Sequence, residues 1–201
     1  MPTALLSAFD KTDLVDFARS LQLLGWDLLG SQGTAKYLDE HGVSVLDVAE
    51  IVGPPILGHK VVTLSREIHA ALLADDTPEE QAELDRIDVP RIDLLYVNLY
   101  PLEQEAKNPA RTLASILGKT DIGGPTMLRS AAKGRRIVLH SQSQFQYALG
   151  HLARRQDTTE EDWRKFIAGL VFNVEMEVSR YCSISASAQF ETSNVDPNGR
   201  M

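Results

Sequence analysis

The segment from Ile92 to Tyr100 constrains the fold more than any other part of the sequence. Its string, IDLLYVNLY, is apolar nearly throughout and ends at Pro101. A continuous apolar run of this length is typical of a central strand covered on both faces, and such strands occur in parallel sheets. Further strands are predicted at residues 3–9, 26–30, 45–52 and 136–140.

Segments with helical periodicity separate these strands. Apolar residues recur at helical spacing from Leu14 to Leu21, ahead of Gly25. Further helices are predicted to end at residues 41–42, to span residues 66–74, to begin at Pro78 with Thr77 as N-cap, and to end at Lys133. Residues 56–65 are expected to be extended. Strands that alternate with helices predict an α/β fold, a mainly parallel sheet flanked by helices.

The last helix carries the longest apolar stripe. From Trp163 to Tyr181, apolar residues follow helical spacing over about five turns. Two partners suit such a stripe: the chain's own sheet, or a second copy of the chain in a homodimer. Residues 183–201 are small and polar, so we expect a loosely held tail behind one domain of residues 1–182.

Composition excludes several classes of protein. The chain has 201 residues, a formal net charge of -8 and one cysteine, Cys182, which cannot form an internal disulfide. This excludes a disulfide scaffold and favours a reducing compartment. No apolar stretch reaches the ~18 residues of a membrane helix, and the N-terminus lacks the basic region of a signal peptide, so we expect a cytoplasmic protein without a membrane partner. The acidic balance also argues against a nucleic-acid partner.

Three strand ends predict a shared ligand site. Because the carboxyl ends of parallel strands meet at one edge of a sheet, residues 7–12, residues 31–34 and Tyr100 should lie near one another. Hydroxyl groups and glycines ahead of a helix suit an anion such as phosphate, since backbone N–H groups and the helix dipole face it. The same residues can also serve as plain helix caps, and both interpretations stay open.

A second candidate segment is Asp121–Pro125, in which a carboxylate precedes two glycines and a proline at a predicted helix start. This pattern fixes a turn and leaves backbone amides open to a ligand. The alternative is an N-cap aspartate followed by flexible glycines. Lys133, at the far end of the same helix, is on its own compatible with a solvated surface lysine.

Five strings together resemble a known family. LLSAFDKTDLVDFARSL, GTAKYL, VVTLSREIHAALLA, DLLYVNLYP and TDIGGPTMLRSAAK, in this order, resemble the inosine monophosphate cyclohydrolase domain of the bifunctional purine-biosynthesis enzyme over residues 3–150. The resemblance implies a methylglyoxal-synthase-like fold, a homodimer, and a cofactor-free dehydrating ring closure of a formamido-imidazole carboxamide ribotide to inosine monophosphate. The formyltransferase domain of that enzyme does not follow in this sequence, so a separate formyltransferase is a further candidate partner.

The resemblance assigns catalysis to four positions, of which three match. By resemblance, Asp121 positions or deprotonates the carboxamide, while Tyr100 and Lys133 assist the oxyanion and proton transfer. The fourth position, a lysine in the family, is Val62 here. Lys60 is the candidate replacement, because alternate residues of an extended strand project to the same side.

The other candidate residues are expected to bind the nucleotide substrate. They are Ser7, Lys11, Thr12, Ser31, Gly33, Thr34, Lys60, Thr63, His69, Gly123 and Gly124. For His69, filling the wall of the crevice is the alternative. Gln32 departs from the family, which has a glycine there that lets the backbone approach phosphate closely. No metal is expected, since the histidines and Cys182 lack ligand spacing, and no cofactor is implied.

Two classes of function therefore remain. The first is a cyclohydrolase-type enzyme of purine biosynthesis, or a diverged paralogue that acts on a related nucleotide-like substrate. The second is a non-catalytic nucleotide-binding partner of a separate formyltransferase. The three retained residues favour the first class, and Val62 favours a changed substrate or a lost activity.

Overall fold

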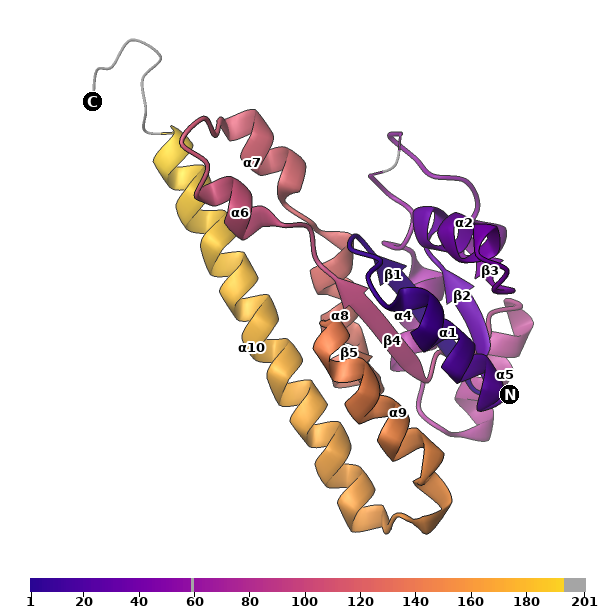
Figure 1. Cartoon of the computed structure of the whole chain (residues 1–201). Coiled ribbons are helices and arrows are strands. Elements are labelled where there is room, and N and C mark those ends of the chain that lie inside the picture. Colours follow the sequence, from indigo (N-terminus) through magenta and orange to yellow (C-terminus); the bar gives the residue numbers. More distant parts are fainter. Residues whose placement is uncertain (59, 194–201) are drawn as a thin grey trace.

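The computed structural model describes residues 1–58 and 60–193 and has an α/β architecture (Figure 1). Its sheet has five strands in the order β3-β2-β1-β4-β5, and every neighbouring pair is parallel. The strands are β1 (Thr3–Ala8), β2 (Asp27–Gly30), β3 (Leu46–Asp47), β4 (Leu94–Asn98) and β5 (Ile137–Leu139). The predicted fold class is confirmed.

Strand β4 is the buried strand that the apolar run predicts. Its residues Leu94 to Val97 are buried, and it pairs with β1 on one side and β5 on the other. Helices cover both faces of the sheet, which is why the run shows no polar alternation. Tyr100 lies beyond the end of the strand and is partly exposed.

Ten α-helices fill the described residues. They are α1 (Leu14–Leu23), α2 (Gln32–Glu40), α3 (Ala49–Val52), α4 (Arg66–Leu73), α5 (Pro78–Arg86), α6 (Leu102–Ala106), α7 (Leu113–Lys119), α8 (Gly123–Lys133), α9 (Phe145–Ala153) and α10 (Glu160–Ser193). The predicted start of α5 is confirmed, because the Thr77 hydroxyl accepts a hydrogen bond from the Glu80 N–H at 3.3 Å and Pro78 is the first helical residue.

Helix α10 runs along one side of the molecule for its whole length (Figure 1). It packs on β5 and α8 in the middle and on α6 and α7 near its C-terminal end. The apolar stripe therefore covers the chain's own core, as the first of the two interpretations has it. Its buried residues include Phe166, Leu170, Val174, Val178 and Tyr181.

The tail predicted from Ser183 onward is wrong as far as Ser193, because α10 continues through these residues. Ser185 and Ala188 are buried, and Ala188 belongs to a small apolar cluster with Leu102 and Ile116 of the neighbouring helices. Small side chains let α6 and α7 approach α10 closely. Residues 194–201 lie outside the described residues, and the boundary of the domain at residue 182 stays a prediction.

Two predicted extended segments are also wrong. Residues 45–52 contain only the short edge strand β3, after which the Asp47 carboxylate accepts a hydrogen bond from the Ala49 N–H at 2.9 Å and α3 begins. Residues 56–58 and 60–65 form no strand beyond a single isolated bridge between Ile56 and Val61. β-branched residues suggested a strand there, but Leu57 and Gly58, with φ of 54° and 77°, reverse the chain.

Within residues 1–58 and 60–193, none of the helices combines the length and the apolar character needed to cross a lipid bilayer.

Candidate functional site

A cavity of about 910 Å³ lies at the carboxyl edge of the sheet. It is formed by the ends of β1, β2 and β4, by the first turns of α2 and α8, and by the segments around residues 60–63 and 117–121. Its lining contains Ser7, Lys11, Ser31, Gly33, Thr34, Lys60, Thr63, Tyr100, Asp121, Gly123 and Gly124. Most of the residues singled out in the sequence therefore meet at one place.

Three hydroxyl groups form a chain at one end of this cavity. The Ser7 hydroxyl donates to the Ser31 Oγ at 3.0 Å, and the Ser31 hydroxyl donates to the Thr34 Oγ1 at 3.2 Å. Thr34, which is buried, also accepts a hydrogen bond from the Ala8 N–H at 2.9 Å. Hydroxyl groups can rotate toward a ligand, so this cluster supplies adjustable donors to an anion.

The start of α2 adds backbone donors to the hydroxyl cluster. Gly30 precedes it, and a Cβ atom built on Gly30 would lie 2.9 Å from the Ala35 backbone nitrogen. Only glycine permits this close turn from β2 into α2. The first N–H groups of a helix lack partners within the helix and carry its positive dipole end, so the N–H groups of Gln32 and Gly33 form a geometry suited to phosphate. The Ser31 N–H instead donates to the Leu6 carbonyl oxygen at 3.0 Å.

Two lysines bring positive charge to the cavity. The Lys11 ammonium group donates to the carbonyl oxygens of Ala8 and Phe9 at 3.2 and 3.4 Å, which holds it beside the hydroxyl cluster. Lys60 lines the opposite turn and is exposed. In a chain with a net charge of -8, these side chains provide the local neutralisation that an anionic ligand requires.

Asn98 organises the loop after β1 and was not found by the sequence analysis. Its side-chain oxygen accepts hydrogen bonds from the N–H groups of Phe9 and Asp10, and its amide nitrogen donates to the Asp10 carbonyl oxygen at 2.8 Å. The signal was available in the position of Asn98, a polar residue at the carboxyl end of the most apolar strand. Thr12 bonds to the Asp10 carboxylate at 2.7 Å and does not line the cavity.

Asp121 is the half-buried carboxylate of the cavity. Its Oδ1 accepts a hydrogen bond from the Gly124 N–H at 3.0 Å, so it both caps α8 and faces the cavity. Burial raises the pKa of Asp121 above its ordinary value, although the N–H groups of Gly124 and Gly123 oppose this shift. A carboxylate with a raised pKa is suited to accept and release a proton.

The glycines after Asp121 are required by close packing. A Cβ atom on Gly124 would overlap the Asp121 carboxylate and lie 2.7 Å from Leu99 Cδ2, and one on Gly123 would lie 2.9 Å from the Thr63 Oγ1. Neither glycine therefore has room for a side chain, and the alternative of an N-cap aspartate followed by flexible glycines stays open. Thr63, in turn, lies against the start of α8.

Tyr181 of α10 holds the turn that carries Asp121. Its hydroxyl accepts a hydrogen bond from the Asp121 backbone N–H at 2.7 Å and donates one to the Lys119 carbonyl oxygen at 2.8 Å. Burial raises the pKa of Tyr181 to about 12, which keeps the hydroxyl protonated. In the sequence, Tyr181 fits the apolar stripe only, because its hydrogen-bond partners lie about 60 residues away in the chain.

Tyr100 stands at the mouth of the cavity. Its ring packs edge-to-face on Phe9 with centroids 5.3 Å apart. Burial, and secondarily the negative charge of Asp121, raise the pKa of Tyr100 above its ordinary value. The phenol therefore keeps its proton at neutral pH and can donate a hydrogen bond into the cavity.

Val62 and Lys60 both line the cavity, although the segment between them is not an extended strand. The prediction that Lys60 and Val62 project to the same side of an extended strand is wrong, because Lys60 belongs to a turn. Lys60 and Val62 nevertheless line the same cavity, as the predicted replacement of the family's lysine by Lys60 requires.

Besides Thr12, two predicted site residues lie away from the cavity. Lys133 is exposed at the far end of α8, ten residues and therefore ~15 Å from Gly123. His69 does not line the cavity, and its Nδ1 lies 2.8 Å from the Ser130 hydroxyl on the side of α8. Burial lowers the pKa of His69, so it is neutral at pH 7. Because His69 does not line the cavity, neither substrate binding nor the alternative role in the crevice wall is supported.

No group of three or more histidine, cysteine, aspartate or glutamate side chains with the arrangement of a metal site occurs in residues 1–58 and 60–193. The cavity instead offers hydroxyls, backbone amides, two lysines, one half-buried carboxylate and one phenol. This set of groups can bind a phosphorylated ligand and move a proton on it.

Comparisons with known proteins agree with this architecture. The sequence matches the family described as "MGS-like domain" over residues 13–126. A solved structure described as "Crystal structure of ForH" is similar to this chain with a TM-score of 0.77 and 28% sequence identity, and the similarity covers 94% of this chain and 98% of that chain. The methylglyoxal-synthase-like fold is thus confirmed, whereas a more specific relationship is not decided by either match.

Proposed function

The chain belongs to the MGS-like domain family, and on this premise we propose that it is an enzyme that closes a pyrimidine ring on a phosphorylated formamido-imidazole carboxamide ribotide. In this reaction the carboxamide nitrogen attacks the formyl carbon, a carbinolamine forms, and water leaves as the C=N bond of inosine monophosphate is made. The reaction needs a base near the nitrogen, a donor near the developing oxyanion, and an anchor for the phosphate.

The hydroxyl cluster is the proposed phosphate anchor. Ser7, Ser31 and Thr34 lie within hydrogen-bond distance of one another, and the first N–H groups of α2 lie beside them. Lys11 supplies positive charge to the same end of the cavity. A phosphate held there would leave the ribose and the heterocycle to extend toward α8.

Asp121 is the proposed base and Tyr100 the proposed donor. Asp121 is half-buried at the start of α8, and a carboxylate of raised pKa takes a proton from the attacking nitrogen more readily than a solvated one. Tyr100 keeps its proton and can donate to the formyl oxygen as it becomes an oxyanion and then leaves as water. Lys60 takes the cationic role that Val62 cannot provide.

One observation carries this proposal: the half-buried Asp121 carboxylate shares a cavity with a hydroxyl and helix-start cluster suited to phosphate. The experiment is to add the formamido ribotide to the protein and to follow purine formation by ultraviolet absorbance. Asp121→Asn should abolish turnover with the ribotide still bound, and Ser31→Ala should raise KM. Glu79→Gln, at the exposed start of α5, serves as the matched control.

A second candidate is the same chemistry on a related nucleotide-like substrate. Val62 replaces the lysine and Gln32 the glycine that the cyclohydrolases carry, and both residues line the cavity. The similarity to ForH over nearly the full length of both chains supports a relative other than the cyclohydrolase domain itself. Tight binding of inosine monophosphate without any ring closure would favour this candidate, or a non-catalytic binding protein.

The proposal extends to a homodimer, which the cyclohydrolase resemblance implies. Phe172, Met176 and Phe190 are exposed by 66%, 58% and 70% and lie along one side of α10. Large apolar side chains that recur along one helix face are typical of a surface that a second copy covers. A separate formyltransferase remains a candidate supplier of the substrate.

A further inference from the structure

A second cavity, of about 370 Å³, lies at the opposite edge of the sheet. Its lining includes residues that come immediately before strands: Pro2 before β1, Trp26 before β2, Asp93 before β4 and Arg136 before β5. Strand β4 and the two residues after it separate this edge from Tyr100 by ~20 Å. The cavity is therefore distinct from the candidate active site.

Arginine and tryptophan dominate the lining of the second cavity. Four arginines contribute to it, together with one carboxylate, that of Asp93; the arginines are Arg91, Arg135, Arg136 and Arg155. Both tryptophans of the chain, Trp26 and Trp163, line it as well, and neither lines the first cavity. Four guanidinium groups and two indole rings thus gather at one place, and carboxylates pair with two of the guanidinium groups, those of Arg91 and Arg155.

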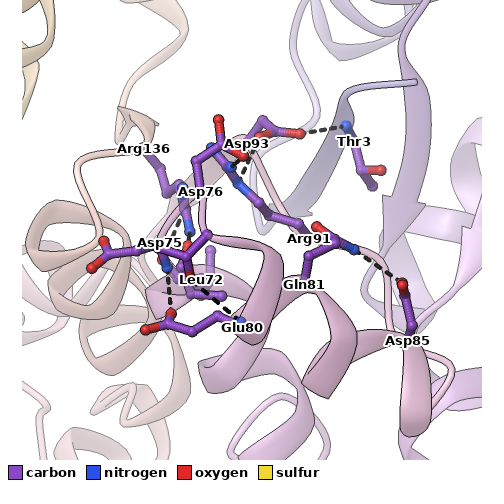
Figure 2. Close-up of polar contacts among 12 residues, drawn as sticks. Thr3, Leu72, Asp75, Asp76, Glu80, Gln81, Asp85, Arg91, Asp93 and Arg136 are labelled. Carbon is purple, nitrogen blue, oxygen red and sulfur yellow. Dashed lines mark hydrogen bonds and ion pairs between the residues drawn. The ribbon is translucent and has the colours of Figure 1, made fainter.

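Two of the arginines are fixed parts of the wall (Figure 2). Arg91 forms ion pairs with Asp76 at 2.9 Å and with Asp93 at 3.1 Å, and the Asp93 carboxylate also accepts a hydrogen bond from the Thr3 N–H. Arg136 is buried and donates to the carbonyl oxygens of Leu72 and Ala74. Because carbonyl oxygens do not neutralise a guanidinium, Arg136 keeps its positive charge in the wall.

The other two arginines keep N–H groups that a ligand can reach, since Arg155 uses only its Nη2 toward Glu160. Arg135 is exposed, and within residues 1–58 and 60–193 its guanidinium has no hydrogen-bond or ion-pair partner. Its backbone has a φ of 54°, a conformation that glycine adopts at lower cost, so an arginine is held there at a conformational expense. Arg155 lies over the Trp163 ring at 4.6 Å from its centroid and pairs with Glu160.

We propose that this second cavity binds a nucleoside monophosphate. Arg135 and Arg155 would hold the phosphate by charge-assisted hydrogen bonds, and the half-buried rings of Trp26 and Trp163 would contact the base. The volume of the cavity lies within the range of ligand sites, ~300–1,000 Å³. A bound nucleotide would lie across the sheet from the active site, so the site is independent of the proposed ring closure.

The two tryptophans make the test selective, because their fluorescence reports on the second cavity alone. Inosine monophosphate is titrated while the emission is followed with excitation at the red edge of the indole band. We expect a saturable change in emission that inosine or inorganic phosphate reproduces only at concentrations at least ~10-fold higher, since each supplies one half of the contacts. An equal response to inorganic phosphate alone would overturn the nucleotide assignment.

Variants separate the two cavities. Arg135→Gln and Arg155→Gln should each weaken the fluorescence response at least ~10-fold, since each removes a charged donor. Lys11→Gln, in the first cavity, and Arg154→Gln, an exposed neighbour outside the lining of the second, should leave the response unchanged. Loss of the response in Lys11→Gln instead would overturn the assignment.

Equilibrium dialysis with labelled inosine monophosphate detects binding even if the tryptophan emission does not change. We expect the Lys11→Gln variant to retain one nucleotide per chain and the double variant of Lys11→Gln with Arg135→Gln to retain none. If the first cavity does not retain inosine monophosphate, the product of the proposed reaction, the wild type binds one nucleotide that only the arginine variants remove, which supports this site. No nucleotide bound to Lys11→Gln would refute the second site.

Discussion

The Tyr181 hydroxyl bridges the backbone on both sides of Thr120, since it accepts from the Asp121 N–H at 2.7 Å and donates to the Lys119 carbonyl oxygen at 2.8 Å. The same turn is tied to α10 a second time by the 3.2 Å contact between the hydroxyls of Thr120 and Ser185. The long helix therefore fixes the position of the candidate catalytic carboxylate.

Replacing Tyr181 by phenylalanine should reduce turnover. The change leaves the Asp121 N–H without its partner, which costs about 1–3 kcal/mol in the free energy of unfolding, as urea denaturation measures it. A loosened turn misplaces the carboxylate, and we expect kcat to fall about 10- to 100-fold, with a smaller change in KM. Tyr147→Phe, on an exposed side chain of α9, is the control. Unchanged kcat in Tyr181→Phe would show that the bridge has no role in positioning.

Gly124→Ala should impair the site more than the fold, because the added methyl group meets the Asp121 carboxylate and Leu99. We expect loss of most ring-closure activity and a pKa change of the carboxyl, since the hydrogen bond from the Gly124 N–H is disturbed. Gly169→Ala in α10, where a Cβ atom meets nothing within 4 Å, should instead raise the free energy of unfolding by about 0.5–1 kcal/mol. Equal activity of the two variants would contradict the packing argument.

The pH dependence follows from the raised pKa of Asp121. Between the ordinary value of 3.8 and the raised pKa, the native state holds a proton that the unfolded state has released, so the contribution of Asp121 to stability falls as the pH rises through this interval. A base must be ionised, so kcat/KM should rise over the same interval and reach its half-maximum above pH 3.8. Asp121→Asn should remove the fall in stability. A half-maximum at or below the ordinary value would contradict a half-buried base.

Lys60 should matter as the cation beside Val62. Lys60→Ala is expected to lower kcat about 100- to 1,000-fold if the ammonium stabilises the developing charge. Val62→Lys in the Lys60→Ala background should recover part of that loss, since both positions line the same cavity. Lys36→Ala, on the exposed side of α2, is the matched control. Undiminished ring closure in Lys60→Ala would show that Lys60 has no role in the reaction.

The apolar face of α10 should control self-association. Phe172→Asp together with Met176→Asp places two charges on the exposed face and should shift the chain from dimer to monomer in sedimentation equilibrium. Leu23→Asp, at an 89% exposed position on α1, should leave the oligomeric state unchanged. A wild-type chain that sediments as a monomer would refute the proposed homodimer.

The sequence predicts the sheet and the carboxyl-edge cavity because both depend on local patterns. The apolar run that contains β4 requires cover on both faces, and strand ends of a parallel sheet converge whatever their side chains. The predicted length of the edge strand β3 is too great, because the apolar residues of the following helix resemble a strand in the sequence. In the structure Asp47 accepts a hydrogen bond from the Ala49 N–H, and the helix begins there.

Long-range contacts explain what the sequence could not predict. Tyr181 fits the apolar stripe of α10 by spacing, and nothing local indicates that its hydroxyl meets the turn before α8. The role of Lys133 was carried over from a resemblance, yet the length of α8 separates it from Asp121 within one chain. Asn98 and the tryptophan and arginine cavity likewise join residues from separate strands.

The most direct test is ring closure itself, measured with purified protein and the formamido-imidazole carboxamide ribotide, with purine formation followed by ultraviolet absorbance. We predict that the wild type turns the ribotide over and that Asp121→Asn abolishes this turnover. The Asp121→Asn variant should still bind the ribotide, as equilibrium dialysis measures it. No ring closure by the wild type, or equal ring closure by Asp121→Asn, would contradict the central claim that this carboxylate acts on a phosphorylated ribotide.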